Sequence, residues 1–240
     1  EEIIVNTSLK FFQGDFNPEF FRYPTLYMYL LYAVFKMYLF LQNMRGLNVT
    51  IPDYRIAYQD LSEYYLLDRA FSVFWGTLSI LVVYKLAKVS FNRKVALISS
   101  FFLALTFLHV RDSHFGVTDI PLTFFILCSV FFIIKSYQGK NTINYLIAGL
   151  LSGLAASIKY NGFLLILPMV LVHIINVFDK KESITQLFFD ERILLYFSAV
   201  SFAFLLGTPY AYWEFKKFIN QFLLEFDHLQ EGHGINLGRG

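Results

Sequence analysis

The chain has 240 residues, of which 56% are hydrophobic, 20% aromatic and 16% charged, and its formal net charge is +2 at pH 7. Soluble domains carry about 25% charged residues, and one core of this size cannot cover so much apolar surface. The composition excludes an ordinary soluble domain, and it also excludes a disordered chain, which would need low hydrophobicity and high net charge. Because the charge is nearly balanced, we expect no nucleic-acid partner.

The sequence begins at Glu1, without an initiator methionine or an apolar leader. We therefore expect a piece of a longer protein, in which a segment further upstream directs insertion into the membrane. The one cysteine, Cys128, excludes an intrachain disulfide and a cysteine-based zinc site.

Residues 1–64 are predicted to form a loop on the outer face of the membrane with interfacial helices. Within them, residues 23–44 are apolar and rich in tyrosine, with Lys36 as the one charge. This stretch fits a membrane span, but it also fits a helix in the interface, where tyrosine is enriched. Residues 45–64 turn polar, which predicts an exposed loop.

Six stretches without Asp, Glu, Lys or Arg follow, as expected of membrane spans. They cover residues 70–84, 95–110, 120–134, 141–158, 160–178 and 193–213. We expect helices, because lipid offers no partner to the backbone and barrel strands would alternate polar and apolar residues. The fold predicted is an all-α, polytopic transmembrane bundle, with a six-helix module over 65–213 and an outer juxtamembrane tail over 214–240.

The loops between the predicted spans differ in charge. Alternate loops carry most of the lysines and arginines: Lys85, Lys88, Arg93 and Lys94 in the first, Lys135 and Lys140 in the second, and Lys180, Lys181 and Arg192 in the third. The positive-inside rule places these loops in the cytoplasm. The other loops, with mixed charge, then share the outer face.

Charged residues at the outer ends of the spans are candidates for function, because charge near lipid is costly. Asp119 comes just before Pro121, which predicts a helix start. Its carboxylate fits a helix cap, and it fits a general base or metal ligand equally well. His109, Asp112 and His114 have no spacing typical of a metal site, so we assign no metal ligands, and a divalent metal cofactor stays an open alternative.

Lys159 lies between two predicted spans, with no acid near it in the sequence, and Asn161 and Gly162 predict a tight turn beside it. It fits a lysine that reaches toward lipid phosphates, or a cation that binds a substrate phosphate. Small residues at Gly149 and Gly153 predict a closely packed helix. For Asp68 and Arg69 we expect a plain interfacial anchor.

Five short motifs follow one another at the predicted span ends. They occupy residues 20–26, 68–72, 111–119, 158–162 and 206–210. Their order resembles the GT-C glycosyltransferases that use lipid-phosphate sugars, in the group of the protein O-mannosyltransferases and aminoarabinose transferases. The resemblance covers essentially the whole chain, and it implies a GT-C bundle in which 23–44 lies in the interface.

The resemblance also implies a set of site residues. Glu1 would end an Asp-Glu pair whose Asp lies just upstream, and Asp119 would be a second catalytic carboxylate. Lys159 would bind the lipid phosphate of the donor. Tyr23 stands where the family has a lysine, so that role would pass to Arg22, with help from Arg111. The remaining contacts to donor or acceptor would come from His228, Asp112 and His114.

The function that the resemblance implies is transfer of a sugar such as mannose, with inversion, from a polyprenyl-phosphate or dolichyl-phosphate donor to a hydroxyl group. The acceptor would be a protein, a lipid or a glycan. The site would face the outer or lumenal side of a prokaryotic plasma membrane or the endoplasmic reticulum, among membrane lipids. Without the upstream Asp, the chain by itself would be inactive. A membrane transporter and a non-catalytic membrane scaffold are the alternatives.

Overall fold

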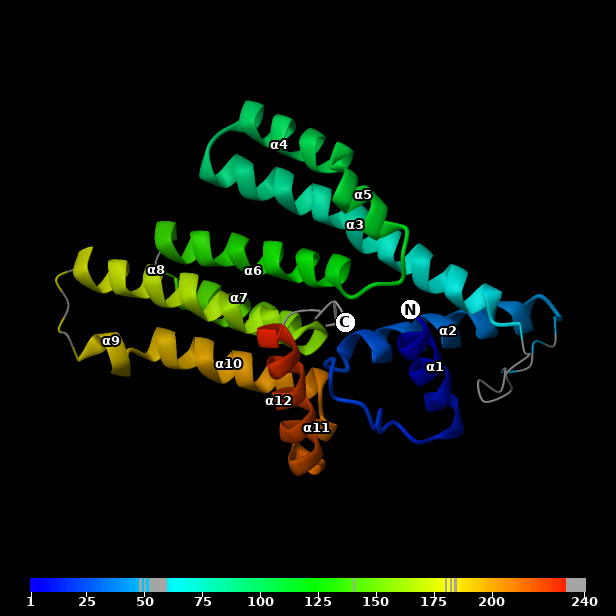
Figure 1. Cartoon of the computed structure of the whole chain (residues 1–240). Helices are drawn as coiled ribbons and strands as arrows, with labels where there is room; N and C mark the ends of the chain where they lie inside the picture. Colours follow the sequence, from blue (N-terminus) through cyan, green and yellow to red (C-terminus); the bar gives the residue numbers. More distant parts are fainter. Residues whose placement is uncertain are drawn as a thin grey trace, which may run out of the picture.

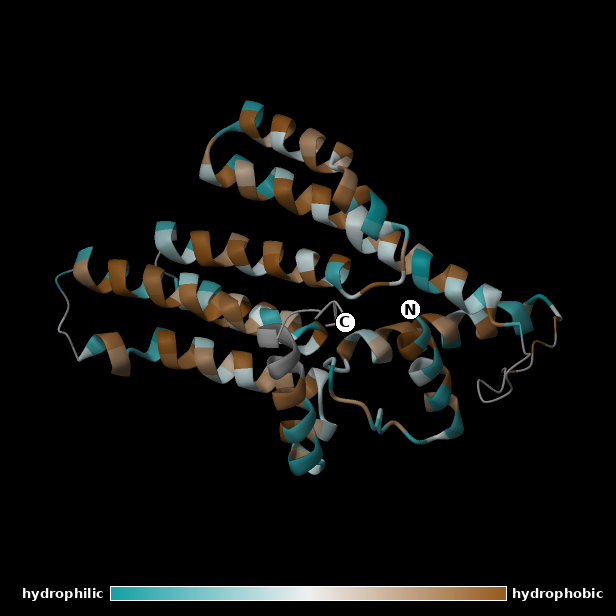
Figure 2. Cartoon of the chain, viewed as in Figure 1, coloured by the Kyte–Doolittle hydropathy of each residue, from teal (hydrophilic) through white to brown (hydrophobic). Residues whose placement is uncertain are grey.

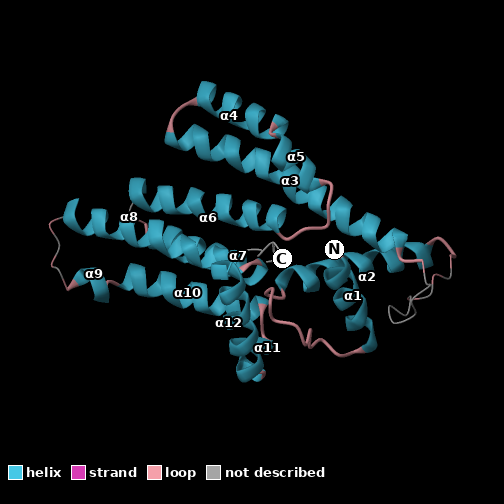
Figure 3. Ribbon diagram, in the orientation of Figure 1, coloured by secondary structure: helices cyan, strands magenta, loops and turns pink. Residues whose placement is uncertain are grey.

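The computed structural model describes residues 1–47, 49, 51, 60–139, 141–179, 181, 183 and 185–231, with side chains as far as residue 224. Those residues form helices and connecting loops and no strand (Figure 3). The predicted all-α fold is therefore confirmed. The polar loop predicted over 45–64 lies partly outside the described residues, because 52–59 are not among them.

The helices follow the predicted spans closely. The bundle contains α3 (Ser62–Ser90), α4 (Arg93–Leu105), α5 (Phe107–Ser113), α6 (Asp119–Gly139), α7 (Thr142–Ile158), the 3-10 helix η2 (Tyr160–Leu165), α8 (Ile166–Asp179), the short α9 (Gln186–Phe189) and α10 (Glu191–Gly207). Two of the helices, α4 and α7, start at asparagine caps. The side chain of Asn92 accepts a hydrogen bond from the Val95 N–H, and that of Asn141 accepts one from the Ile143 N–H, both at 3.0 Å.

Three of the described helical segments are long and apolar enough to cross a membrane, namely α3, α6 and the continuous run of η2 and α8. The pair α4 and α5 makes a fourth if it counts as one span. Helix α7 is apolar but shorter, with 17 residues, and α10 also has 17. These helices make the chain an integral membrane protein, and the crossing of α7 and α10 stays a prediction.

The span predicted over 95–110 consists of two helices rather than one continuous helix. The backbone is extended at Thr106, and α4 and α5 meet there at a bend of 58°. The Thr106 hydroxyl donates a hydrogen bond of 2.8 Å to the Phe102 carbonyl, one turn earlier. This side-chain hydrogen bond competes with the helical backbone hydrogen bonds at the point where α4 ends.

Helices α7 and α10 pack closely through glycine. A Cβ atom at Gly149 would lie 2.5 Å from the Tyr196 carbonyl oxygen, and one at Gly153 would lie 2.4 Å from the Val200 carbonyl oxygen. The predicted close packing is therefore confirmed. Hydroxyl groups continue the contact, since Tyr196 donates to Ser152 at 3.0 Å and Ser152 lies 2.8 Å from the Ser129 hydroxyl on α6.

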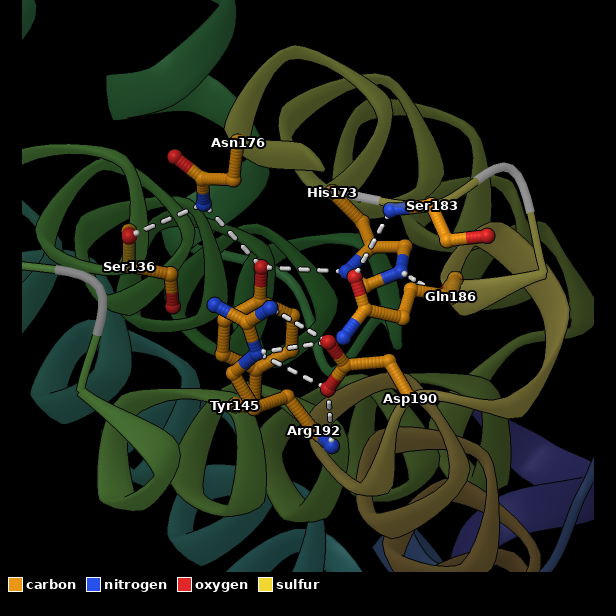
Figure 4. Close-up of polar contacts among 8 residues, drawn as sticks. All are labelled: Ser136, Tyr145, His173, Asn176, Ser183, Gln186, Asp190 and Arg192. Atoms are coloured by element: carbon orange, nitrogen blue, oxygen red, sulfur yellow. Dashed lines mark hydrogen bonds and ion pairs between the residues drawn. The ribbon is translucent and has the colours of Figure 1, made fainter. Parts of the chain in front are cut away.

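A buried polar network joins α6, α7 and α8 at one end of the bundle (Figure 4). Asn176 donates hydrogen bonds to the Tyr145 hydroxyl at 3.0 Å and to the Ser136 carbonyl at 3.2 Å. Nearby, the Arg192 Nε lies 2.8 Å from the Asp190 Oδ1. Because buried charges are stable only when paired, the ion pair fixes the start of α10.

The two ends of the bundle differ, as the charge pattern predicts. The connections after α3, α6 and α8 lie at one end, while the α5–α6 turn, the α7–η2 junction and the end of α10 lie at the other (Figure 1). Hydrophobic residues dominate the helices between these ends (Figure 2). The structure thus groups the loops as predicted, and which end faces the cytoplasm stays a prediction.

The N-terminal segment and the C-terminal tail flank the second end of the bundle, which is the end with the α5–α6 turn and the α7–η2 junction. Helix α1 (Glu2–Lys10), the 3-10 helix η1 (Phe11–Gln13) and α2 (Leu26–Met44) precede the bundle, and α11 (Tyr210–Trp213) and α12 (Phe215–Glu231) follow it. In Figure 1, α1 and α2 lie past the ends of α7 and α10, beside the first half of α3. Helix α2 is not among the candidate spans, which favours the interfacial alternative for 23–44.

The glycine contact between α7 and α10 gives a prediction. Gly153→Ala should place a methyl group against the Val200 carbonyl and force the helices apart, which costs about 1–3 kcal/mol of stability. A melting curve in detergent measures this as a lower melting temperature. The matched control is Gly139→Ala, because a Cβ at Gly139 meets nothing within 4 Å. Equal melting temperatures for the two variants would contradict the close approach.

Candidate active site

A cavity of about 340 Å³ lies at the second end of the bundle, where α1, the α5–α6 turn and the α7–η2 junction meet. Glu1, Asp119 and Lys159 line it, together with Tyr23 and Gly116. The three residues predicted as the two catalytic carboxylates and the phosphate-binding lysine therefore share one cavity. They come from positions 1, 119 and 159 of the chain, so only the fold brings them together.

Lys159 and Asp119 form an ion pair across the cavity wall, with 2.7 Å between Nζ and Oδ1. Asp119 is the first residue of α6, and Lys159 has extended backbone between α7 and η2. The side chains are 29% and 54% exposed for Lys159 and Asp119. No acid lies near Lys159 in the sequence, but the fold brings the distant Asp119 carboxylate close to it in space.

Glu1 is held from two sides. Its carboxylate accepts hydrogen bonds from Arg69, at 3.2 Å from Nε and 2.9 Å from Nη2, and from the Gly116 N–H at 2.7 Å. The hydrogen bond from Arg69 lowers the pKa of the Glu1 carboxyl below its usual value. Glu1 is therefore a fixed anion at neutral pH.

Asp68 is fully buried beneath this contact. Its Oδ1 accepts a hydrogen bond of 2.7 Å from the Tyr27 hydroxyl on α2. The expectation of a plain interfacial anchor is therefore wrong for Asp68, while Arg69 is exposed and binds Glu1. The adjacent acid and base at the end of a predicted span were the signal in the sequence. That signal did not indicate which residues they contact.

The other predicted site residues lie outside the cavity wall. Arg111 pairs with its neighbour Asp112, with 2.8 Å between Nη2 and Oδ1, and the His114 Nδ1 lies 2.6 Å from the Val110 carbonyl. Arg22 is exposed, and none of its polar atoms has a partner among the described residues. His228 belongs to α12, but its side chain is outside the described part of the chain.

No group of three or more His, Cys, Asp and Glu side chains in the described part of the chain is arranged to hold a metal ion. His109, considered as a metal ligand from the sequence, is buried and its Nε2 lies 3.2 Å from the Gly76 carbonyl oxygen. The carboxylates of the cavity therefore have only Lys159, Arg69 and backbone N–H groups as described partners of opposite polarity.

Helix α12 packs beside the lysine. The ring of Tyr160, the residue after Lys159, meets the ring of Phe222 edge-on at 4.8 Å. The Tyr160 hydroxyl donates a hydrogen bond of 2.6 Å to the Phe21 carbonyl, and the Phe21 N–H donates one of 2.5 Å to Gln221. The N-terminal loop, the Lys159 junction and the tail therefore form one packed unit at this end.

Fold and cavity together define a class of protein: an all-helical membrane bundle with a carboxylate–lysine cavity at one end. The family model described as dolichyl-phosphate-mannose-protein mannosyltransferase matches residues 68–213. The chain belongs to this family, which confirms the GT-C resemblance of the five motifs. The match begins at Asp68 and covers all six predicted spans.

A curated relative shows the same likeness. The chain is 29% identical over 154 residues to dolichyl-phosphate-mannose–protein mannosyltransferase 1 of Saccharomyces cerevisiae, an alignment that covers 61% of this chain and 18% of that protein. The chain thus spans less than a fifth of that relative. No solved structure matches the chain.

The pair of Arg69 and Glu1 gives a prediction about pH. Because the folded-state pKa of Glu1 is lowered, the pair stabilises the fold above the ordinary glutamate pKa of 4.5, and this contribution is lost as the pH falls through the folded-state value. Arg69→Gln should therefore lower the melting temperature slightly at pH 7, because a solvent-exposed ion pair contributes little to stability.

Melting temperatures of the wild type and Arg69→Gln between pH 7 and pH 3 would measure this. The difference in melting temperature between the two proteins should shrink toward zero as the pH approaches 3. Arg45→Gln is the matched control, because Arg45 is exposed and distant in sequence from the cavity residues. A difference that stays constant over the whole range would count against the pair.

Proposed function

We propose that the cavity is the donor site of a membrane mannosyltransferase, which transfers mannose from a dolichyl-phosphate or polyprenyl-phosphate donor to a protein hydroxyl. The observation that carries this proposal is the single cavity lined by Lys159, Asp119 and Glu1. Family membership supports the reaction class, and the name of the yeast relative supports the donor and the protein acceptor.

The positive charge of Lys159 can stabilise a phosphate that leaves with negative charge. Its ammonium group carries three N–H donors, so Lys159 can contact Asp119 and a phosphate oxygen at once. It stands at the end of the bundle, where a lipid-borne headgroup lies while its tail stays between apolar helices. Charge stabilisation at the leaving oxygen is the contribution we assign to Lys159.

The two carboxylates can deprotonate and orient the acceptor hydroxyl. In the proposed step the Asp119 carboxylate takes the proton of the acceptor hydroxyl, and the oxygen attacks the anomeric carbon. The bond from that carbon to the phosphate oxygen breaks, and the phosphate keeps the electron pair. The attack from the opposite side inverts the sugar. Glu1, fixed by Arg69 and Gly116, would orient the reacting hydroxyl groups.

The residues outside the cavity wall keep supporting roles in the proposal. Arg22 and Arg111 would add positive charge near the donor at the same end of the bundle. His228, Asp112 and His114 would contact the donor or the acceptor. This end would face the outside of the cell or the lumen of the endoplasmic reticulum, because the basic loops lie at the other end.

Activity measurements on the full-length enzyme test the two central residues. Lys159→Ala should raise the KM for the lipid-phosphate donor and lower kcat, because the leaving phosphate loses its cation. Asp119→Asn should lower kcat by about 10²–10⁴-fold, the range for loss of a general base. Transfer of radiolabelled mannose from the donor to an acceptor peptide provides the measurement.

Lys88→Ala and Asp15→Asn are the matched controls, because both change the same residue types away from the cavity and should leave transfer unchanged. Normal transfer by Lys159→Ala and Asp119→Asn would overturn the proposed function. That result, together with normal folding, would favour a membrane scaffold, whereas uptake of a solute by the reconstituted protein would favour a transporter.

A further inference from the structure

Asp68 differs from the other acids near the cavity, because it is buried and does not line the cavity. Its side chain is 0% exposed. The Oδ1 atom accepts the Tyr27 hydroxyl at 2.7 Å, and the same hydroxyl lies 3.3 Å from the Ser72 Oγ. The Oδ2 atom has no hydrogen-bond partner in the described part of the chain. Burial of such an oxygen is costly.

The free oxygen of Asp68 lies directly against the backbone at Gly116. A Cβ atom at that position would stand 1.9 Å from Oδ2 and 2.4 Å from Cγ. No side chain fits at position 116 unless the carboxylate moves, so glycine is needed there for close approach rather than for an unusual backbone angle. The carboxylate and the Gly116 backbone thus fix each other's positions.

Gly116 is also a direct partner of the cavity. Its N–H donates the 2.7 Å hydrogen bond to Glu1, and Arg69, the residue next to Asp68, holds the same carboxylate. Asp68 and Arg69 therefore support the contact between Gly116 and Glu1 from neighbouring positions on α3.

Gly116 is also close in the chain to Asp119, the second carboxylate of the cavity. Three residues further on, Asp119 begins α6 and pairs with Lys159. Between them, Thr118 is buried and its carbonyl accepts the Leu122 N–H at 3.0 Å, so this short turn has little freedom. A shift of Gly116 would move Glu1 and Asp119 together.

We propose that Asp68 is a positioning residue: its carboxylate, held by Tyr27, sets the place of the Gly116 backbone and through it the places of Glu1 and Asp119 in the cavity. The inference rests on the proposed function for its effect on activity. An apolar side chain could fill the same space at lower cost, but it would accept no hydrogen bond from Tyr27, and the link to α2 would be lost.

The test compares Asp68→Ala, Gly116→Ala and the double variant in the full-length enzyme. Each single variant should lower kcat by about 10²-fold, the cost of a displacement near 1 Å, with the donor KM unchanged. In the double variant the new methyl group occupies space that the carboxylate vacated, so the melting temperature should recover. The kcat should stay low, because the hydrogen bond to Tyr27 is still missing.

Recovery of kcat in the double variant would overturn the proposal, since it would show that Asp68 only fills space. Asp68→Asn keeps the shape and the acceptor for Tyr27, and it should retain most of the activity. It also keeps the test valid where Asp68→Ala fails to fold. Asp190→Asn is the matched control, because Asp190 is a buried acid at the opposite end and its loss should lower stability without changing kcat.

A second measurement does not depend on mannose transfer. Hydrogen exchange of the backbone amides over residues 116–119 should speed up in Asp68→Ala and stay unchanged in Asp190→Asn. Unchanged exchange over 116–119 in Asp68→Ala would overturn the positioning role by itself. Faster exchange with no transferase activity in any variant, including the wild type, would instead overturn the proposed function and leave the positioning role standing.

Discussion

Apolar surroundings confine charge to the ends of the helices, and the rest of the structure follows from this constraint. A helix in lipid satisfies its own backbone, but a charged side chain in its middle has no partner. Acids and bases therefore collect where the helices begin and end. Lys159, Asp119 and Glu1 meet at one such end and enclose a cavity, whereas the basic loops stand at the other. The polarity of the bundle and the place of its site have the same cause.

Within the site, Lys159, Asp119 and Glu1 each have a partner of opposite charge from a distant part of the chain. Lys159 pairs with Asp119, 40 positions earlier, and Arg69 pairs with Glu1, 68 positions earlier. Such pairs are strongest where water is partly excluded, and here they hold the groups that the proposed reaction needs. The Lys159 ammonium group has three N–H donors, so it can bind Asp119 and still donate a hydrogen bond to a phosphate. The balance thus stabilises the cavity without blocking the proposed chemistry.

The contact between α7 and α10 depends on small residues and buried hydroxyl groups as well as on apolar side chains. Lipid tails are as apolar as leucine, so helices in a membrane gain by close packing and hydrogen bonds. Gly149 and Gly153 bring α7 against α10, and Ser129, Ser152 and Tyr196 connect their hydroxyl groups beside them. This places the C-terminal end of α7, and with it Lys159, at a fixed distance from the start of α6.

The sequence alone determined the helical membrane fold, the grouping of loops on two sides, the close packing of α7 and the family, because these depend on local composition, spacing and motif order. It also singled out Asp119 and Lys159. Only the tertiary structure decided that these two neutralise each other, that α4 and α5 bend at Thr106, and that Asp68 is buried against Gly116 rather than exposed as an anchor. These are contacts between distant segments, and spacing along one chain carries no information about which distant groups will meet.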